Sequence, residues 1–185
     1  YPLMYSEMTL LTALRTAATS ALAIDLMARK DSQTLAIIGT GAQSEFQAKA
    51  ARIVRKIKEI RFFDIDTKAM DKFANNLKGN DLKLIRCKSV EETTEGADII
   101  TICTACYGHF NILKKDWVKA GVHINAIGGD SKGKTELEKS ILPMCRIVVE
   151  YFEQSKDEGE IQVFTKAKAK KLVYAELYEL IKGHK

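Results

Sequence analysis

The sequence has few cysteines and no cysteine pattern that would build a disulfide framework. Its four cysteines, Cys87, Cys103, Cys106 and Cys145, are spread over a chain of 185 residues, which indicates a reducing compartment such as the cytoplasm. Cys103-Thr104-Ala105-Cys106, followed by His109, has the spacing of a metal or redox motif, but the chain has no second cysteine pair to close a zinc site. We therefore expect no bound metal, and we expect these thiols to be small packing residues at the end of a strand.

The sequence also lacks a secretory signal, an uninterrupted apolar run of membrane length, internal repeats and low-complexity segments. The net charge is only +5, because 29 Lys and Arg residues are mixed with 24 Asp and Glu residues. The one dense basic run, Lys166-Ala167-Lys168-Ala169-Lys170-Lys171, is more typical of a solvated surface than of a binding patch. We expect a cytoplasmic protein without a nucleic-acid or membrane partner.

Composition and length fit one globular domain with an appendage, since 46% of the residues are hydrophobic and 29% are charged. The chain begins at Tyr1-Pro2 without an initiator Met and enters a helical pattern almost at once. We therefore expect an upstream domain to be absent from this chain.

The rest of the sequence is organised around the stretch Leu35-Ala36-Ile37-Ile38-Gly39-Thr40-Gly41-Ala42-Gln43-Ser44. Its apolar half is long enough for one buried strand, and residues 45–57 have the spacing of an amphipathic helix. At such a strand-to-helix turn, Gly39 makes the tight bend, and Gly41 lets the backbone and the helix N-terminus approach a pyrophosphate. Alone, a Gly-x-Gly turn is a weak signal, because glycines at the end of a buried strand often mark only a turn.

A second signal follows at the expected distance. Residues 60–64 read as a strand that ends in Asp64, which lies 23 residues after Gly41, close to the offset at which a carboxylate meets the adenosine ribose. Asp66 is better placed to cap the next helix, starting near Thr67. Because no Arg or Lys follows Asp64 until Lys68, a 2′-phosphate has no obvious counter-ion, and NAD is favoured over NADP.

Helices and strands continue to alternate along the chain. We expect further strands at 82–85, 97–102, 122–127 and 146–150, and short helical segments beginning at Ser89 and spanning 135–142. Six strands joined by helices predict a doubly wound parallel sheet, a Rossmann-type NAD-binding domain, over residues 31–165. Residues 1–30 would be a connecting helix toward the absent domain, and 166–185 a helical tail with an amphipathic helix at 174–181.

Arg15 is the only charged residue between Glu7 and Asp25, on a helix that is otherwise small and apolar. A guanidinium among small apolar side chains needs an anionic partner, and its planar pair of N–H donors matches the two oxygens of a carboxylate. The sequence leaves open whether that partner is a carboxylate-bearing substrate or an internal ion pair, or whether Arg15 extends to solvent.

A glycine-rich loop, residues 128–137, follows the fifth predicted strand, where a nicotinamide and its substrate would meet. Asp130 is the candidate general acid/base of this loop. The alternative is a loop carboxylate satisfied by backbone N–H groups or by Lys132. The spacing from Gly128 to Gly133-Lys134-Thr135 also meets the P-loop pattern, although the chain already has a better nucleotide cradle at its first strand.

Six motifs of the chain together carry a family resemblance. They are Ser6-Glu7-Met8-Thr9, Leu14-Arg15-Thr16-Ala17-Ala18, Ile38-Gly39-Thr40-Gly41-Ala42-Gln43-Ser44-Glu45-Phe46-Gln47, Asn125-Ala126-Ile127-Gly128-Gly129-Asp130, Gly133-Lys134-Thr135-Glu136-Leu137 and Glu158-Gly159-Glu160-Ile161-Gln162. In these motifs the sequence resembles the ornithine cyclodeaminase/mu-crystallin family, and the resemblance covers nearly the whole chain. It removes the P-loop interpretation.

The resemblance implies an NAD-dependent reaction that turns ornithine into proline and ammonia by oxidation, cyclisation and re-reduction, within a homodimer. It assigns Ala42 and Gln43 to the pyrophosphate, Asp64 to the ribose, Arg15 to the substrate carboxylate and Asp130 to acid/base chemistry. The chain departs from the family at Ser131-Lys132, where Cys-Pro is usual. Lysine as substrate, an alanine dehydrogenase-like or imine oxidoreductase and a non-catalytic mu-crystallin-like binder remain alternatives.

Overall fold

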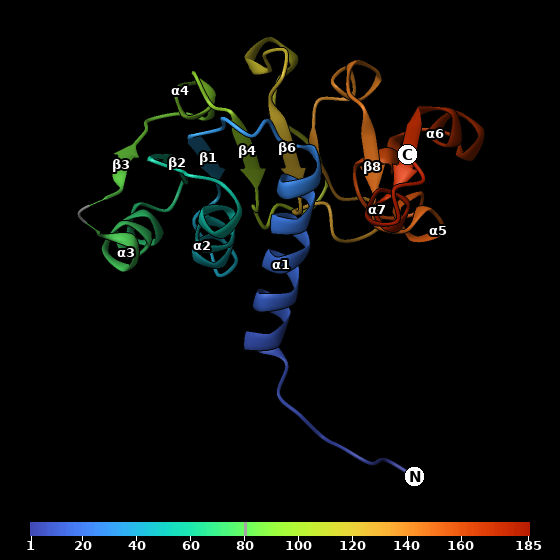
Figure 1. The fold of residues 1–185 in the computed structure, drawn as a ribbon, viewed down its shortest axis with the longest axis horizontal. Helices are drawn as coiled ribbons and strands as arrows, with labels where there is room; N and C mark the ends of the chain where they lie inside the picture. The colour runs from blue at the N-terminus through green and yellow to red at the C-terminus, as the bar shows by residue number, and fades with distance from the viewer. Residues whose placement is uncertain (80) are drawn as a thin grey trace.

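The computed structural model describes residues 1–79 and 81–185, and its central feature is a parallel sheet of five strands (Figure 1). The strand order is β3-β2-β1-β4-β6, and every pairing is parallel. The strands are β1 (Thr34–Ile38), β2 (Glu59–Phe63), β3 (Lys83–Arg86), β4 (Ile99–Ile102) and β6 (His123–Ala126). This is the order of a doubly wound sheet, whose ligand crevice opens where the order reverses, between β1 and β4.

Apolar side chains of β1 pack on both faces of the sheet. Leu35 and Ile37 belong to a core cluster with the helices α2 (Ser44–Val54) and α3 (Thr67–Leu77), whereas Ala36 and Ile38 belong to a second cluster with C-terminal residues. This two-sided burial explains why the strand is an uninterrupted apolar run rather than an alternating one. The Rossmann-type fold expected from the sequence is confirmed.

Two helix starts follow the sequence expectation. Asp66 caps α3, because its carboxylate accepts hydrogen bonds from the backbone N–H groups of Lys68 and Ala69. Ser89 caps α4 (Val90–Thr94) by accepting from the N–H of Glu92. Side-chain oxygens at these positions satisfy N–H groups that have no partner inside the helix.

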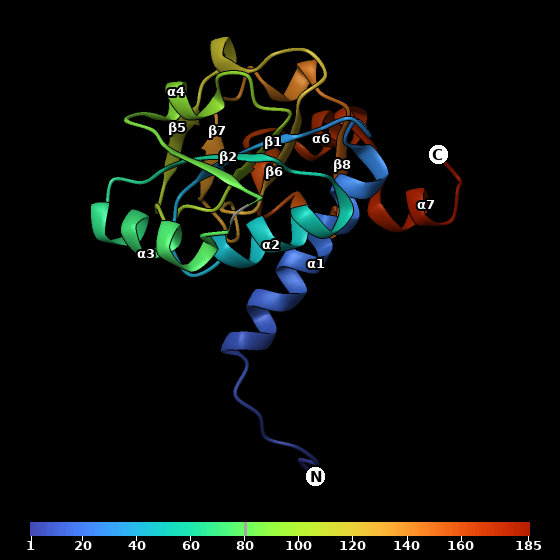
Figure 2. The ribbon, with the colours of Figure 1, turned by 60° about the vertical axis from the view of Figure 1, so that its left-hand side comes forward.

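The helix that carries Arg15, α1 (Thr9–Met27), packs against α2 through small residues, Ala17, Ala21 and Ala50. Its C-terminal end is fixed by Arg55, whose side chain is 3% exposed and donates hydrogen bonds to the carbonyls of Ile24 and Ala28. The carbonyl of Ile24 also accepts from the N–H of Ala28, whereas Ala28 itself lies just past the last helical residue. The guanidinium therefore caps the C-terminal end of α1. Figure 2 shows the first turns of α1 extending beyond the sheet.

Length and composition alone would let α1 cross a membrane, since it has 19 residues and a mean hydropathy of 1.3. The helix is not an uninterrupted apolar run, because it carries Arg15 and Asp25. In the structure 28% of its most apolar window is buried, and its small residues Ala17 and Ala21 pack against α2.

The C-terminal part corrects three expectations. The expected helix at 135–142 is a strand, β7 (Thr135–Leu137), which pairs with β5 (His109–Leu113). The expected sixth strand, β8 (Ile147–Val149), follows β6 along the same row in Figure 1 but pairs with β9 (Val173–Glu176) in a separate two-stranded sheet. The tail helix is therefore shorter, α7 (Leu177–Ile181). For β7 and for the start of the tail, pairing with a strand distant in sequence overrode the local helical pattern.

The remaining short elements are helices that follow β5 or surround β8 and β9. They are η1 (Lys115–Trp117), η2 (Leu142–Met144), α5 (Phe152–Ser155), η3 (Glu160–Val163) and α6 (Lys166–Leu172). Because β9 pairs with β8, the tail packs on the same unit as the main sheet, although the domain boundary at residue 165 stays a prediction.

Candidate functional site

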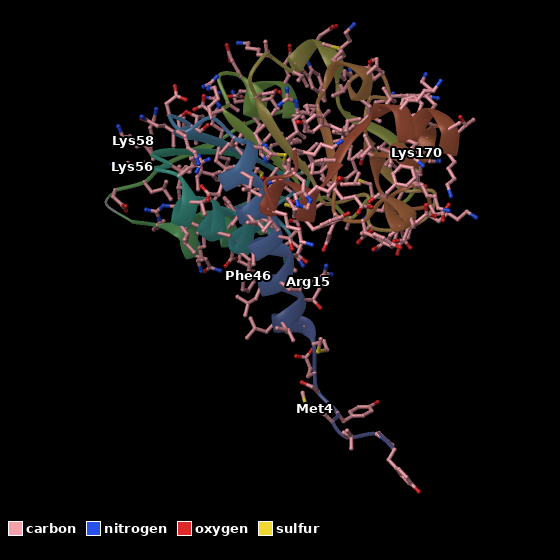
Figure 3. The ribbon with its side chains drawn as sticks, turned by 45° about the vertical axis from the view of Figure 1, so that its right-hand side comes forward. Met4, Arg15, Phe46, Lys56, Lys58 and Lys170 are labelled. Carbon is pink, nitrogen blue, oxygen red and sulfur yellow. The ribbon has the colours of Figure 1, made fainter. Side chains whose placement is uncertain are left out.

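A cavity of about 430 Å³ lies beside the carboxyl end of β6, between α1 and the segment that follows β8. Three residues singled out in the sequence line it: Arg15 from α1, Gln43 from the glycine turn and Asp130 from the loop after β6. Figure 3 labels Arg15 on α1, with Phe46 of α2 nearby. Carboxyl ends of parallel strands are where ligands bind in this fold, so this cavity is the candidate site.

The glycine turn is built as the sequence predicts. Gly39 has φ of +91°, and a Cβ there would lie 2.9 Å from the backbone of Cys103 and from the methyl group of Thr104. This position therefore requires glycine both for its conformation and for its close approach to the end of β4. Gly41 differs, because a Cβ there would meet nothing within 4 Å. The space above Gly41 is open to a ligand.

Asp64 lies directly after β2 and holds the glycine turn. Its Oδ2 accepts hydrogen bonds from the N–H of Thr40 at 2.6 Å and from the Thr40 hydroxyl at 3.2 Å, and its Oδ1 accepts from the N–H of Asp66 at 2.9 Å. An ionised carboxylate offers about four acceptor positions, so Asp64 keeps capacity for a ribose hydroxyl. Ser44, the small residue in the third glycine position, is fully buried and donates its hydroxyl to the carbonyl of Gly41.

Asp130 pairs with Lys134, not with Lys132, the partner considered from the sequence. Its Oδ1 lies 2.9 Å from Nζ of Lys134. The Asp130 side chain is 69% exposed and that of Lys134 only 6%. Nζ of Lys134 also lies 5.7 Å from the centre of the Tyr107 ring. The ammonium is therefore held from two sides, next to the Asp130 residue that lines the cavity.

Arg15 makes no ion pair within the part of the chain that the structure describes. It is exposed to solvent and lines the cavity. The internal ion pair considered from the sequence is thus not formed here, and the guanidinium is available to an anionic ligand.

Two buried acids lie beneath the Asp130 loop, and sequence reasoning assigned them no role. Glu136 is fully buried, accepts a hydrogen bond from the Thr104 hydroxyl, and occupies the space that a Cβ at Gly128 would fill. Burial raises the pKa of Glu136. In the sequence, only the presence of Glu136 and Glu160 in the family motifs pointed to a role for them. Their contacts join residues 24 and 32 positions apart, and contacts over such separations leave no local sequence pattern.

The second acid, Glu160, lines the cavity and accepts hydrogen bonds from the backbone N–H groups of Glu136 and Leu137, at 2.9 and 3.0 Å. Burial raises the pKa of Glu160 to about 7, although these two N–H groups favour its charged form. This carboxyl therefore titrates near neutral pH inside the wall of the cavity.

The thiol of Cys103 donates a hydrogen bond to the carbonyl of Gly39 at 3.0 Å, and burial raises the pKa of the thiol. Cys103 packs against the core cluster that contains α2 and α3. Among the described residues, no group of three or more His, Cys, Asp or Glu side chains could hold a metal ion. This cysteine is a packing residue at the end of β4, as the sequence predicts.

Comparison with known proteins agrees with this architecture. The family model described as "Ornithine cyclodeaminase/mu-crystallin family" matches residues 1–185. An ornithine cyclodeaminase of Agrobacterium tumefaciens (strain Ach5) is 50% identical over 185 residues, which cover all of this chain and 51% of that protein.

Two solved structures are similar over almost the whole chain. An archaeal alanine dehydrogenase dimer with bound NAD has a TM-score of 0.91 and 35% identity, covering 100% of this chain and 57% of that one. The Thermococcus litoralis Δ1-pyrroline-2-carboxylate reductase with NADH and L-proline has a TM-score of 0.89 and 32% identity, covering 97% and 56%. The chain spans about half the length of the curated relatives it matches, and it belongs to the ornithine cyclodeaminase/mu-crystallin family.

Proposed function

We propose that this chain is the NAD-binding part of an NAD-dependent ornithine cyclodeaminase, an enzyme that converts L-ornithine to L-proline and ammonia. The observation that carries the proposal is the cavity that brings Arg15, Gln43 and Asp130 together beside the glycine turn, in a chain 50% identical to an ornithine cyclodeaminase. Such an enzyme would act in amino-acid metabolism, in proline biosynthesis, and we propose that it is cytoplasmic.

NAD fits the residues of the glycine turn. Open space above Gly41 leaves room for a pyrophosphate next to the backbone of Ala42 and Gln43, at the start of α2. Asp64 retains acceptor capacity for a ribose hydroxyl after its three internal hydrogen bonds. When bound, NAD would supply reversible hydride transfer, which the oxidation and the later reduction both require.

Arg15 would hold the substrate carboxylate. The guanidinium has no internal counter-ion in the described residues and lines the cavity, and a bidentate pair with a carboxylate fixes both position and orientation. The Cα–H bond of the substrate would thereby face the cofactor site at the carboxyl end of the sheet.

Asp130 would manage protons at the substrate amines. Its carboxylate faces the cavity and is oriented by Lys134. It would take a proton from the α-ammonium group before oxidation and give one to the amine that leaves as ammonia, after the terminal amine has attacked the imine carbon. The products, proline and ammonia, contain all the atoms of ornithine, and no net oxidation occurs.

A dimer of the whole enzyme is part of the proposal, supported by the archaeal alanine dehydrogenase described as a dimer. The sedimentation mass of a full-length protein that carries these residues tests it, and a monomer at assay concentrations would refute it.

A second candidate is an amino-acid oxidoreductase of the alanine dehydrogenase kind, because an Archaeoglobus fulgidus alanine dehydrogenase is 37% identical over 163 residues. One assay separates the two. A full-length protein carrying these residues is incubated with NAD and either ornithine or alanine, and ammonia, proline and absorbance at the NADH wavelength are followed together. Equal amounts of ammonia and proline without net NADH support the cyclodeaminase; stoichiometric NADH with alanine refutes it.

The isolated 185-residue chain offers a simpler test of the cofactor. Calorimetric titration with NAD and NADP is expected to give binding of NAD and weaker binding of NADP, since no cation follows Asp64 until Lys68. Tighter binding of NADP would contradict this part of the proposal.

A further inference from the structure

Gln162 lies in η3, outside the residues to which any role has been given above, and its side-chain amide has four hydrogen-bonding partners. Its Oε1 accepts from the backbone N–H of Gly133 at 2.6 Å. Its Nε2 lies within donating distance of three carbonyls, those of Gly159 at 2.8 Å, Lys134 at 3.0 Å and Ser131 at 3.3 Å. One side chain therefore joins η3 to both ends of the turn 131–134.

That turn determines where the Asp130–Lys134 pair lies. The N–H of Lys134 bonds to the carbonyl of Ser131 at 3.2 Å, and Gly133 has φ of +80°, a conformation that side chains other than glycine rarely adopt. Because the buried Lys134 side chain reaches back to Asp130, a shift of the turn would move the carboxylate that faces the cavity.

Only an amide can make this set of contacts. Gln has one acceptor oxygen and two N–H donors, whereas Glu offers no donor when ionised and Leu offers neither. The strand that follows, β7, is fixed separately by Glu160 through the N–H groups of Glu136 and Leu137. The segment 159–162 thus holds the loop at two points, and Gln162 is the one that reaches the turn beside Asp130.

We propose that Gln162 is a positioning residue, which keeps the Asp130 carboxylate oriented toward the substrate cavity by holding the turn 131–134. The role in turnover rests on the proposed function, but the contact itself does not. Two experiments are therefore needed, one on the contact and one on turnover.

Hydrogen exchange on the 185-residue chain tests the contact without substrate or cofactor. Gln162→Leu keeps the size of the side chain and removes its hydrogen bonds, and Gln33→Leu, at an exposed position before β1, is the matched control. We expect the Gly133 amide to exchange at least about tenfold faster in Gln162→Leu, with the amides of β1 and β2 unchanged in both variants. An unchanged rate at Gly133 would overturn the proposal.

Gln162→Glu is an independent variant in case Leu prevents folding. It keeps an acceptor for the Gly133 N–H but places a carboxylate against three carbonyl oxygens, so we expect faster exchange at the Lys134 amide, which bonds to the carbonyl of Ser131. A protein indistinguishable from wild type at this amide would also overturn the proposal.

A double-mutant cycle in a full-length protein tests the effect on turnover. We expect Gln162→Leu to lower kcat about tenfold to a hundredfold, as misplacement of a catalytic group does, with the KM for NAD unchanged. In an Asp130→Asn background the same change is expected to have no further effect, because there is no carboxylate left to position. An equal loss in both backgrounds would reduce Gln162 to a structural residue. A protein that never turns over ornithine would refute the proposed function, and the exchange experiment alone would then decide whether Gln162 holds the turn.

Discussion

Nζ of Lys134 lies 2.9 Å from Oδ1 of Asp130, although the lysine side chain is 6% exposed and the aspartate side chain 69%. A buried ammonium thus depends on a carboxylate at the cavity surface for its counter-charge. We expect Asp130→Asn to lower the free energy of unfolding by roughly 1 kcal/mol, because water already screens the exposed partner.

The double variant Asp130→Asn/Lys134→Met should recover part of that loss, since it no longer leaves a buried charge without its partner. Lys132→Met is the control, because Lys132 lies in the same turn and is exposed. It should have little effect on the free energy of unfolding. Urea unfolding followed by circular dichroism measures wild type, the single variants Asp130→Asn and Lys134→Met, the double variant and the control. Strictly additive losses would show that the pair is not coupled.

The two glycines of the cofactor turn should respond differently to alanine. Gly39→Ala combines a positive φ with overlap against Cys103 and Thr104, so it should destabilise the fold by roughly 2–4 kcal/mol. Gly41→Ala meets no neighbour within 4 Å and should change stability by less than about 0.5 kcal/mol.

Titration of the same variants with NAD tests the role of Gly41 in cofactor binding. Gly41→Ala should fold normally and yet bind NAD about tenfold or more weakly, because its methyl group occupies space left for the pyrophosphate. Thermal unfolding and calorimetry on the 185-residue chain measure both quantities. Normal NAD affinity in Gly41→Ala would remove Gly41 from the cofactor site.

The two aspartates near the end of β2 have separate roles that substitution can separate. Asp64→Ala should weaken NAD by about 1.5–3 kcal/mol if its carboxylate binds the ribose. Asp66→Ala removes the cap of α3 and should cost about 1 kcal/mol of stability while leaving NAD affinity unchanged. Calorimetric titration at a temperature where both variants are folded measures this contrast, and equal losses of affinity would contradict the choice of Asp64.

The sequence predicted the parts of this molecule whose signals are local. The apolar run of β1, the glycine turn, the cap at Asp66 and the acid at the end of β2 all depend on residues within a few positions of one another. β7 and β9 could not be found in this way, because each is a strand only through pairing with β5 or β8. Thr135–Leu137 and Val173–Glu176 adjoin helix-compatible residues, and tertiary pairing decided their structure.

The residues of the candidate site also differ in whether a local sequence signal reveals them. Arg15 and Asp130 stand out in the sequence, since one is a lone charge and the other lies in a glycine-rich loop after a buried strand. The groups that orient Asp130 do not, because Glu160 and Gln162 contact the loop from 23 to 31 residues away. The sequence argument considered Lys132 as the partner of Asp130, whereas the structure pairs Asp130 with Lys134.

Glu160 should make the stability of the chain depend on pH. Its pKa is raised by burial from the usual 4.5 to about 7, so between these values the folded protein binds the proton more readily than the unfolded chain does. The stabilisation is complete below about pH 4.5 and is lost as the pH rises through about 7.

We therefore expect wild type to lose up to about 3 kcal/mol of stability from this group between pH 4.5 and pH 8. Glu160→Gln should show a smaller loss over the same range, although it starts from lower stability because an amide oxygen satisfies the two N–H groups less well. Urea unfolding at four pH values compares the slopes, and identical slopes would contradict the raised pKa. Glu136, whose pKa is also raised by burial, adds through its charge to the rise in the pKa of Glu160, so Glu160→Gln removes this coupling together with the titration of Glu160.

Arg15 and Asp130 should fail in different ways in a full-length enzyme if one holds the carboxylate and the other moves protons. Arg15→Lys keeps the charge but loses the two-pronged geometry, so it should mainly raise KM for ornithine, by an amount equivalent to about 1.5–3 kcal/mol. Asp130→Asn is nearly isosteric but cannot take a proton near neutral pH, so it should lower kcat by about 10²–10⁴. NAD affinity, measured separately by titration, should be little changed in either variant, because neither residue lies in the glycine turn.

Thr19→Ala is the control, because Thr19 lies on the same helix as Arg15, lines the same cavity and carries no charge. It should change the KM for ornithine less than Arg15→Lys does and kcat less than Asp130→Asn does. An Asp130→Asn enzyme that kept its turnover rate would make Asp130 a structural loop residue. Proton transfer would then require a different group in the wall of the cavity. Glu160, whose pKa is raised to about 7, would be the first residue to substitute.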